Sequence, residues 1–145
     1  MHWQRQFLHP MLKAFDAPSR EECTAQRARS NTPLAVLVLL NDPTFVEAAR
    51  VFAQNILRQP GSAESRIDFA FQQAVSRRPD DWERQKLADL LKTSRERYRF
   101  DTEGAARLSH TGEAPLAADV EPFELAAWTT VARAILNLNE TITRN

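Results

Sequence analysis

Polar and ionisable side chains gather in the stretch from residue 16 to residue 42. The set combines carboxylate, guanidinium, thiol, amide and hydroxyl groups, and its members are Asp16, Arg20, Cys23, Arg27, Arg29, Asn31, Thr32, Asn41 and Asp42. These groups could converge on a ligand such as a glycan. They could also form a hydrogen-bonded plug that ties an irregular segment to the rest of the chain, because buried loop backbone must find polar partners. The plug is the favoured interpretation, since helix ends already account for Thr32, Asn41 and Asp42.

Catalysis by this stretch would require a particular arrangement of its carboxylates. Asp16 could form a bidentate ion pair with Arg27 or Arg29. It could also act as one acid of a carboxylate pair with Glu21 or Glu22. Because carboxylates in loops are usually solvated or paired, we assign no catalytic residue.

The thiol and the imidazoles offer a second possible chemistry. Cys23 could act as a nucleophile only if tertiary contact brought one of the three histidines, His2, His9 or His110, next to it. A single cysteine more often packs as a small apolar side chain. His2 and His9, with Met11 nearby, lack a third ligand at suitable spacing. We therefore predict neither a metal site nor a bound cofactor in this chain.

The composition excludes several classes of protein. The chain has 145 residues, 19 basic and 19 acidic side chains, one cysteine and three glycines. A net charge of zero argues against a general binder of nucleic acid or of anionic membranes. One cysteine cannot form an intrachain disulfide. Arg95, Arg97 and Arg99, with Arg77 and Arg78, could form a basic patch. Glu96, Asp101 and Glu103 lie beside them, which is more typical of a solvated helix face.

Two segments differ in their patterning. Residues 1–31 show no sustained period and contain no apolar core of the length that a signal peptide needs, so we expect an irregular segment at the edge of a larger domain. Residues 32–145 form the predicted helical domain. Its first element is the apolar run Leu34–Leu40. The preceding Thr32-Pro33 cap favours a helix, although Val36 and Val38 are also compatible with a β-strand. This apolar run is too short to span a bilayer.

Caps and apolar periodicity predict the other helices. The second helix begins at Asp42-Pro43 and ends at Pro60-Gly61, and the third begins at Ser62 or Ser65 and ends at Arg77-Arg78-Pro79. The fourth begins at Asp80 or Asp81. A short fifth helix covers 102–109 after Asp101, and the last helix runs from Pro122 to about Leu138. The last helix is apolar nearly all round and is expected in the middle of the fold. The predicted fold is all-α, a compact bundle of about five to six helices with the irregular N-terminal segment packed on it.

A family resemblance rests on a long string near the N-terminus. Phe15-Asp16-Ala17-Pro18, then Cys23, then Asn31-Thr32-Pro33 and Leu39-Leu40-Asn41-Asp42 resemble the C-terminal domain of planctomycete cytochrome-C-associated proteins, known as domain of unknown function 1553. Later blocks, among them Ala74–Pro79, Glu124–Trp128 and Ile135–Glu140, extend the resemblance over the whole chain. Ala35 stands where the family usually has glutamine, and Gln26 where it often has a basic residue. A polar site that uses those side chains would be weakened here.

The resemblance implies a larger, exported parent protein. Such proteins usually carry an export signal and a haem-attachment motif of the Cys-x-x-Cys-His type, and haem c is therefore expected only in an upstream domain. This chain is then a C-terminal fragment, extracytoplasmic (periplasmic), with the upstream domains as partners and no nucleic-acid partner.

Three functions follow as hypotheses. The first is a non-catalytic helical domain that serves domain packing or a shared ligand site. The second is a component of an extracytoplasmic enzyme that acts on complex polysaccharide, with polysaccharide as a further partner; it rests on association alone. The third is a free-standing cytoplasmic interaction module, if Met1 is the natural start.

Overall fold

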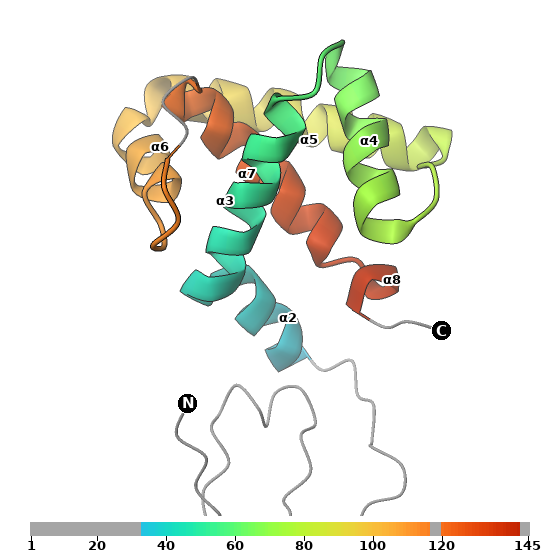
Figure 1. Ribbon diagram of the computed structural model, residues 1–145, viewed down its shortest axis with the longest axis horizontal. Coiled ribbons are helices and arrows are strands. Elements are labelled where there is room, and N and C mark those ends of the chain that lie inside the picture. Colours follow the sequence, from blue (N-terminus) through green and yellow to red (C-terminus); the bar gives the residue numbers. More distant parts are fainter. Residues whose placement is uncertain (1–32, 117–119, 143–145) are drawn as a thin grey trace, which may run out of the picture. The chain divides into compact units, whose positions relative to one another are not determined.

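The computed structural model describes residues 33–116 and 120–142 (Figure 1). The chain divides into two compact units, Met1–Asn41 and Asp42–Asn145. Within the described residues the structure contains seven helices and no strand, which confirms the predicted all-α class. The irregular segment and its packing lie in residues 1–32, outside the described residues, and the predicted boundary after residue 31 stays a prediction.

Helix α2, Pro33–Asn41, is the described part of the first unit. The apolar run Leu34–Leu40, which was also compatible with a β-strand, is therefore helical. Proline at the first helical position explains this outcome, because its fixed backbone angle suits a helix start and it has no N–H to lose there. Leu37 on this helix is 55% exposed.

The second unit contains six helices in its described residues. They are α3 (Pro43–Leu57), α4 (Ala63–Val75), α5 (Asp81–Phe100), α6 (Thr102–Ser109), α7 (Pro122–Leu136) and α8 (Asn139–Ile142). The last predicted helix is in fact two, because the backbone leaves the helical path at Asn137 and Leu138. Asn137 caps α7 by donating its backbone N–H to the carbonyl of Arg133, and a single turn follows as α8.

Aspartate and serine caps fix the helix starts where the sequence predicts them. The Asp42 carboxylate accepts the N–H of Thr44 at 2.9 Å, and Ser62 accepts the N–H of Ser65 at 3.2 Å. Asp80 forms a full capping box with Glu83, with side-chain to backbone distances of 2.7 and 2.8 Å. These bonds satisfy N–H groups that the first turn of a helix leaves without partners.

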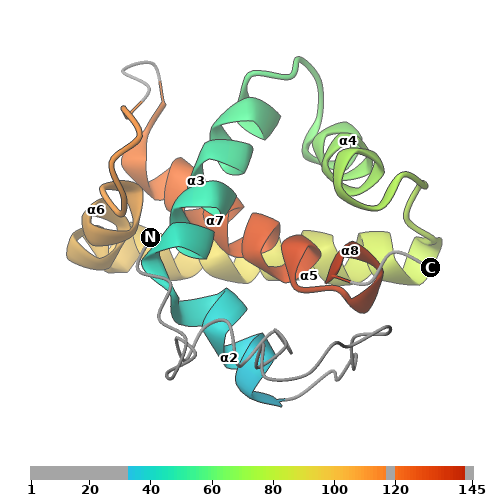
Figure 2. The same cartoon turned by 60° about the horizontal axis from the view of Figure 1, so that its bottom comes forward.

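Helix α7 forms the middle of the second unit (Figure 2). It packs against α3, α5 and α6, and it runs between α3 and α5 in this view. Eight of its side chains are buried with no exposed surface, namely Leu125, Ala126, Ala127, Trp128, Thr129, Val131, Ala132 and Ile135. Alanines on several sides let the neighbouring helices approach closely. The prediction of a central, all-round apolar helix is confirmed.

Candidate functional site

Seven members of the predicted polar set lie outside the described residues: Asp16, Arg20, Cys23, Arg27, Arg29, Asn31 and Thr32. The other two make helix-end contacts. Asn41 Nδ2 donates to the backbone carbonyl of Leu37 at 3.0 Å, and Asp42 caps α3. The convergence of the whole set on a ligand or in a plug stays a prediction.

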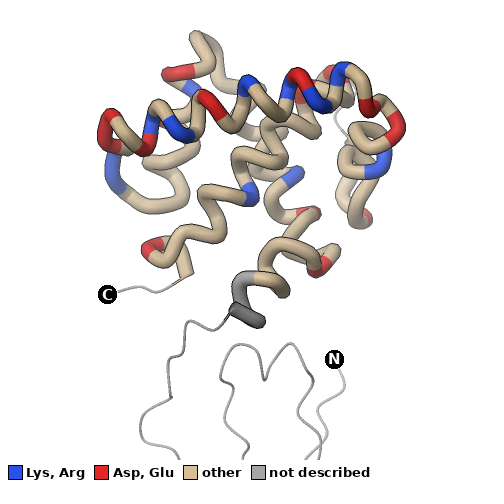
Figure 3. Tube along the Cα trace, turned by 180° about the vertical axis from the view of Figure 1, so that it is seen from behind, with Lys and Arg blue, Asp and Glu red and all other residues tan. Residues whose placement is uncertain are grey.

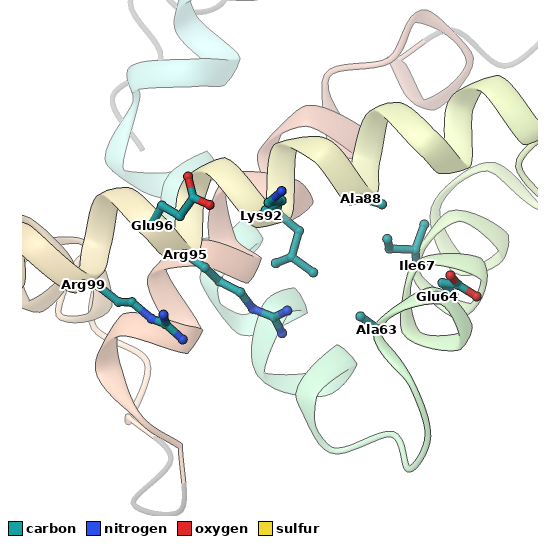
Figure 4. Close-up of a pocket in the computed structure, with 9 residues that line it drawn as sticks. Ala63, Glu64, Ile67, Ala88, Lys92, Arg95, Glu96 and Arg99 are labelled. Carbon is teal, nitrogen blue, oxygen red and sulfur yellow. The ribbon is translucent and has the colours of Figure 1, made fainter.

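A cleft between α4 and α5 is the candidate site that the described residues form (Figure 4). Its volume is about 220 Å³. The apolar part of its lining consists of Ala63 and Ile67 from α4 and Ala88 and Leu91 from α5. Both Ile67 and Leu91 belong to the buried core, so the cleft is an opening onto the core.

Charged side chains surround this apolar floor. Lys92, Arg95, Glu96 and Arg99 come from α5, and Glu64 comes from the first turn of α4. Lys92, Arg95 and Arg99 follow the spacing i, i+3, i+7, which places three cations on one face of a helix. In Figure 4 the guanidinium groups of Arg95 and Arg99 point to the same side of α5. The cleft therefore combines an apolar floor with a charged wall of three cations and two carboxylates.

Arg95 is held in place by a half-buried carboxylate and an indole. Its Nε lies 2.9 and 3.1 Å from the two carboxylate oxygens of Glu124, and its Nη2 contacts the same carboxylate. Trp128, fully buried on α7, donates its Nε1–H to Glu124 at 3.1 Å. Glu124 thus neutralises Arg95 and joins α5 to α7. Lys92 and Arg99 make no ion pair among the described residues, so their charges remain available to a ligand.

A second hollow lies on the Glu124 side of this ion pair. It has a volume of about 250 Å³ and is lined by Leu57, Arg58, Val120, Glu121, Phe123 and Glu124. Because Arg95 lines the first hollow and its partner Glu124 lines the second, the ion pair stands between them. The two hollows are therefore neighbouring parts of one surface.

Another polar cluster fastens a loop to α3. The buried guanidinium of Arg50 donates to the backbone carbonyls of Thr111 at 3.0 Å and Ala114 at 2.6 Å. The Glu47 carboxylate accepts the N–H of Glu113 at 2.8 Å and that of Ala114. Both side chains are engaged with backbone, which is what holding an irregular loop requires.

A third cluster links α4, α5 and α8. Arg77 donates to both oxygens of Glu83 at 2.7 and 2.8 Å and to both oxygens of Glu140 at 2.9 Å. These hydrogen bonds hold the pKa of each carboxyl below its ordinary value and raise the pKa of Arg77. The Arg77 guanidinium also lies 4.8 Å from the centre of the Phe71 ring. The cluster is a surface tie between three helices.

Two further properties concern the described ranges. No group of three or more histidine, cysteine, aspartate or glutamate side chains there is placed to share a metal ion. None of the helices there combines the length and the apolar character needed to cross a bilayer.

The family of the chain follows from a match to a family model. The model described as PSD1, protein of unknown function (DUF1553), matches residues 1–91, which is more than half of the chain. The chain therefore belongs to this family. The match ends in the middle of α5, so the resemblance of Glu124–Trp128 and Ile135–Glu140 lies beyond it. No curated protein and no solved structure matches the chain.

The cleft is a feature that the sequence interpretation missed. Arg97 and Arg99 are exposed as expected for a solvated face, whereas Arg95 is only 32% exposed and bonded to Glu124. The spacing of Lys92, Arg95 and Arg99 was the available signal. It identifies a cationic face, but it does not show which neighbouring element that face meets.

Proposed function

We propose that this chain is a non-catalytic helical docking domain of an exported, multidomain, haem-associated protein. Its role is to pack against the other domains of that protein through a shared site, and haem c belongs to an upstream domain. Support for the export and haem context is the resemblance of the string from Phe15 to Asp42 to such proteins. Support for a docking role comes from the second unit.

The cleft between α4 and α5 carries the docking proposal. An apolar cavity of about 150 Å³ accepts a ring the size of benzene, so 220 Å³ holds one large apolar side chain or two small ones. Lys92 and Arg99 would pair with a carboxylate beside that side chain. The occupant is then a segment of an adjoining domain that presents an apolar residue next to an acidic one.

The charged clusters elsewhere support a non-catalytic role. Glu47 and Arg50 hold a loop, Arg77 ties Glu83 and Glu140, and aspartates cap helices. Each of these side chains has a partner that the fold itself needs. Their contacts are those of a scaffold that presents a surface.

The docking proposal is tested on the native protein captured with an antibody against this chain. Its mass and visible absorbance are measured first, and the expected product is larger than 16.5 kDa and has the absorbance of haem c. A photo-crosslinking amino acid at Ala88 then identifies the segment in the cleft by mass spectrometry. We expect a crosslink to an acidic, apolar segment of an upstream domain.

A matched pair of variants controls the crosslink. Ala88→Trp fills the cleft and should expose the docked segment to proteolysis, whereas Ala106→Trp changes an equally half-buried alanine on α6. A colourless product of 16.5 kDa would overturn the proposal. So would an upstream domain that stays equally protected in both variants, or hydrolysis of a polysaccharide by the purified chain.

A further inference from the structure

The outer face of α5 exposes two large aromatic side chains. Trp82 is 68% exposed in the first turn and Phe100 is 91% exposed at the last residue of the helix. Eighteen residues separate them, which corresponds to five full turns, so both lie on one face about 27 Å apart. Exposing a phenylalanine this fully leaves nearly all of its apolar surface in water.

Polar residues fill the same face between the two rings. Lys86, Asp89, Thr93 and Glu96 lie within about 40° of the line that joins Trp82 to Phe100, and all four are exposed. Figure 3 shows basic and acidic positions interspersed along α5. Helix α7 packs on the opposite side, where Leu91, Ser94 and Tyr98 are buried. The face is therefore a mixed stripe with an aromatic group at each end.

The order of residues along this stripe is self-complementary. Trp82 and Phe100 each lie nine positions from residue 91, and Lys86 and Glu96 each lie five positions from it. Suppose that a second α5 packs antiparallel on this face, with the two helices centred at the level of residue 91 along the helix axis. Each Trp82 then meets a Phe100 of the other copy, and each Lys86 meets a Glu96 of the other copy. A two-fold axis produces both sets of contacts twice.

We propose that a second copy of this chain binds the outer face of α5 in this antiparallel register. Trp82 stacks on Phe100 of the partner subunit, and Lys86 pairs with Glu96 of the partner subunit. Asp89 lies opposite Thr93 of the partner subunit, so this carboxylate faces a neutral side chain and meets no like charge. The two aromatic pairs supply apolar burial and the charges between them set the register.

Charge also selects the antiparallel orientation over the parallel one. In a parallel pair each residue lies opposite its own copy, so Lys86, Asp89 and Glu96 would each face a like charge. Like charges at close range are unfavourable and act against such pairings. A single helix pair buries less than the ~1,600 Å² of a standard interface, so the dimer is reversible and depends on protein concentration.

The experiment is sedimentation equilibrium of the full 145-residue chain over a wide range of concentrations. The wild type should show a monomer–dimer equilibrium, and Trp82→Ala with Phe100→Ala should give a monomer. Lys86→Glu and Glu96→Lys should each raise the dissociation constant about fivefold to thirtyfold, because each reverses the charge at two symmetry-related pairs. The combined variant restores both pairs and should recover wild-type affinity.

Two control variants separate this proposal from the docking function. Arg107→Glu reverses an exposed charge on α6, and Ala88→Trp fills the cleft on another side of α5. Both should dimerise like the wild type. A wild-type chain that stays monomeric at all concentrations would overturn the proposal, as would failure of the charge swap to restore affinity. Because Glu96 also lines the cleft, the docking function is tested separately by the crosslink at Ala88, which leaves Glu96 unchanged.

Discussion

Gly112 shows how a single residue without a side chain completes a polar cluster. Its φ of +94° lies in the region that L side chains rarely adopt, and an added Cβ would come within 2.2 Å of the Glu47 carboxyl carbon. Glu47 cannot turn aside freely, because it accepts two backbone N–H groups of the same loop. The glycine is therefore required both by the backbone angle and by the space next to α3.

We predict that Gly112→Ala lowers the free energy of unfolding by about 2 kcal/mol, through backbone strain and the clash with Glu47. Urea unfolding followed by circular dichroism measures the loss. Glu113→Ala is the matched control, because it keeps the backbone N–H that Glu47 accepts and should change stability by less than about 0.5 kcal/mol. Equal stabilities for the two variants would contradict this account of the loop.

Arg50 illustrates a buried cation that is stabilised by backbone carbonyls. We predict that Arg50→Met costs about 3 kcal/mol, because the carbonyls of Thr111 and Ala114 lose their charged donor. The same urea titration measures it. In a protein that already carries Gly112→Ala, Arg50→Met should lower the free energy of unfolding by less than it does alone, because both substitutions act on one loop. Fully additive losses would show that the two residues act on separate structures.

At the scale of elements, Arg77 joins α8 and the first turn of α5 to the end of α4. Its hydrogen bonds lower the pKa of the Glu83 and Glu140 carboxyls. A carboxyl with a lowered folded-state pKa contributes stability above its unfolded value, near 4.3, and this contribution is lost as the pH falls through the folded-state pKa. The stability contributed by the hydrogen bonds of Arg77 to Glu83 and Glu140 is therefore present at neutral pH and lost in strong acid.

We predict that Arg77→Gln lowers the melting temperature at pH 7, and that this difference shrinks as the pH falls through the lowered pKa values of the Glu83 and Glu140 carboxyls. Thermal melts from pH 7 to pH 2 measure the difference between the two proteins. Arg107→Gln is the control, because that arginine makes only an exposed pair with Glu103. A difference that persists unchanged at pH 2 would show that Arg77 acts through packing on Phe71 instead.

The central helix sets the packing of its neighbours. Ala127 has no exposed surface and lies on α7, which contacts α3, α4, α5, α6 and α8. We predict that Ala127→Leu costs about 1–3 kcal/mol, because added methyl groups must push a packed helix away. Ala106→Leu on α6 places the same group at a half-buried position and should cost less. Chemical denaturation distinguishes them, and equal costs would contradict tight packing around α7.

At the scale of the whole molecule, the buried core that the described residues form lies entirely in the second unit. Its buried residues run from Ala49 to Ile135. We predict that a fragment of residues 42–145 folds by itself and unfolds cooperatively, because every buried member of this core is retained. Circular dichroism and calorimetry of the fragment check this prediction. A broad transition without a heat-absorption peak would show that residues 1–41 are needed for the fold.

The sequence alone determined the class of the fold and most of its helices. Asp42, Ser62, Asp80 and Asp101 are caps whose side chains act within one turn, so local sequence is enough to locate them. The apolar surface all round residues 123–136 is equally local, and it predicted the central helix. The family string also lies within a short stretch, which is why it was recognisable without a structure.

Tertiary structure decided what the charged side chains do. Arg95, Arg97 and Arg99 are alike in sequence, yet only Arg95 reaches Glu124, because α7 begins beside that part of α5. Arg50 and Glu47 are bound to a loop more than 60 residues away, and Arg77 meets Glu140 across a similar separation. A guanidinium can pair with any carboxylate or carbonyl that the fold brings to it. Its partner is therefore set by the packing of helices and not by its place in the chain.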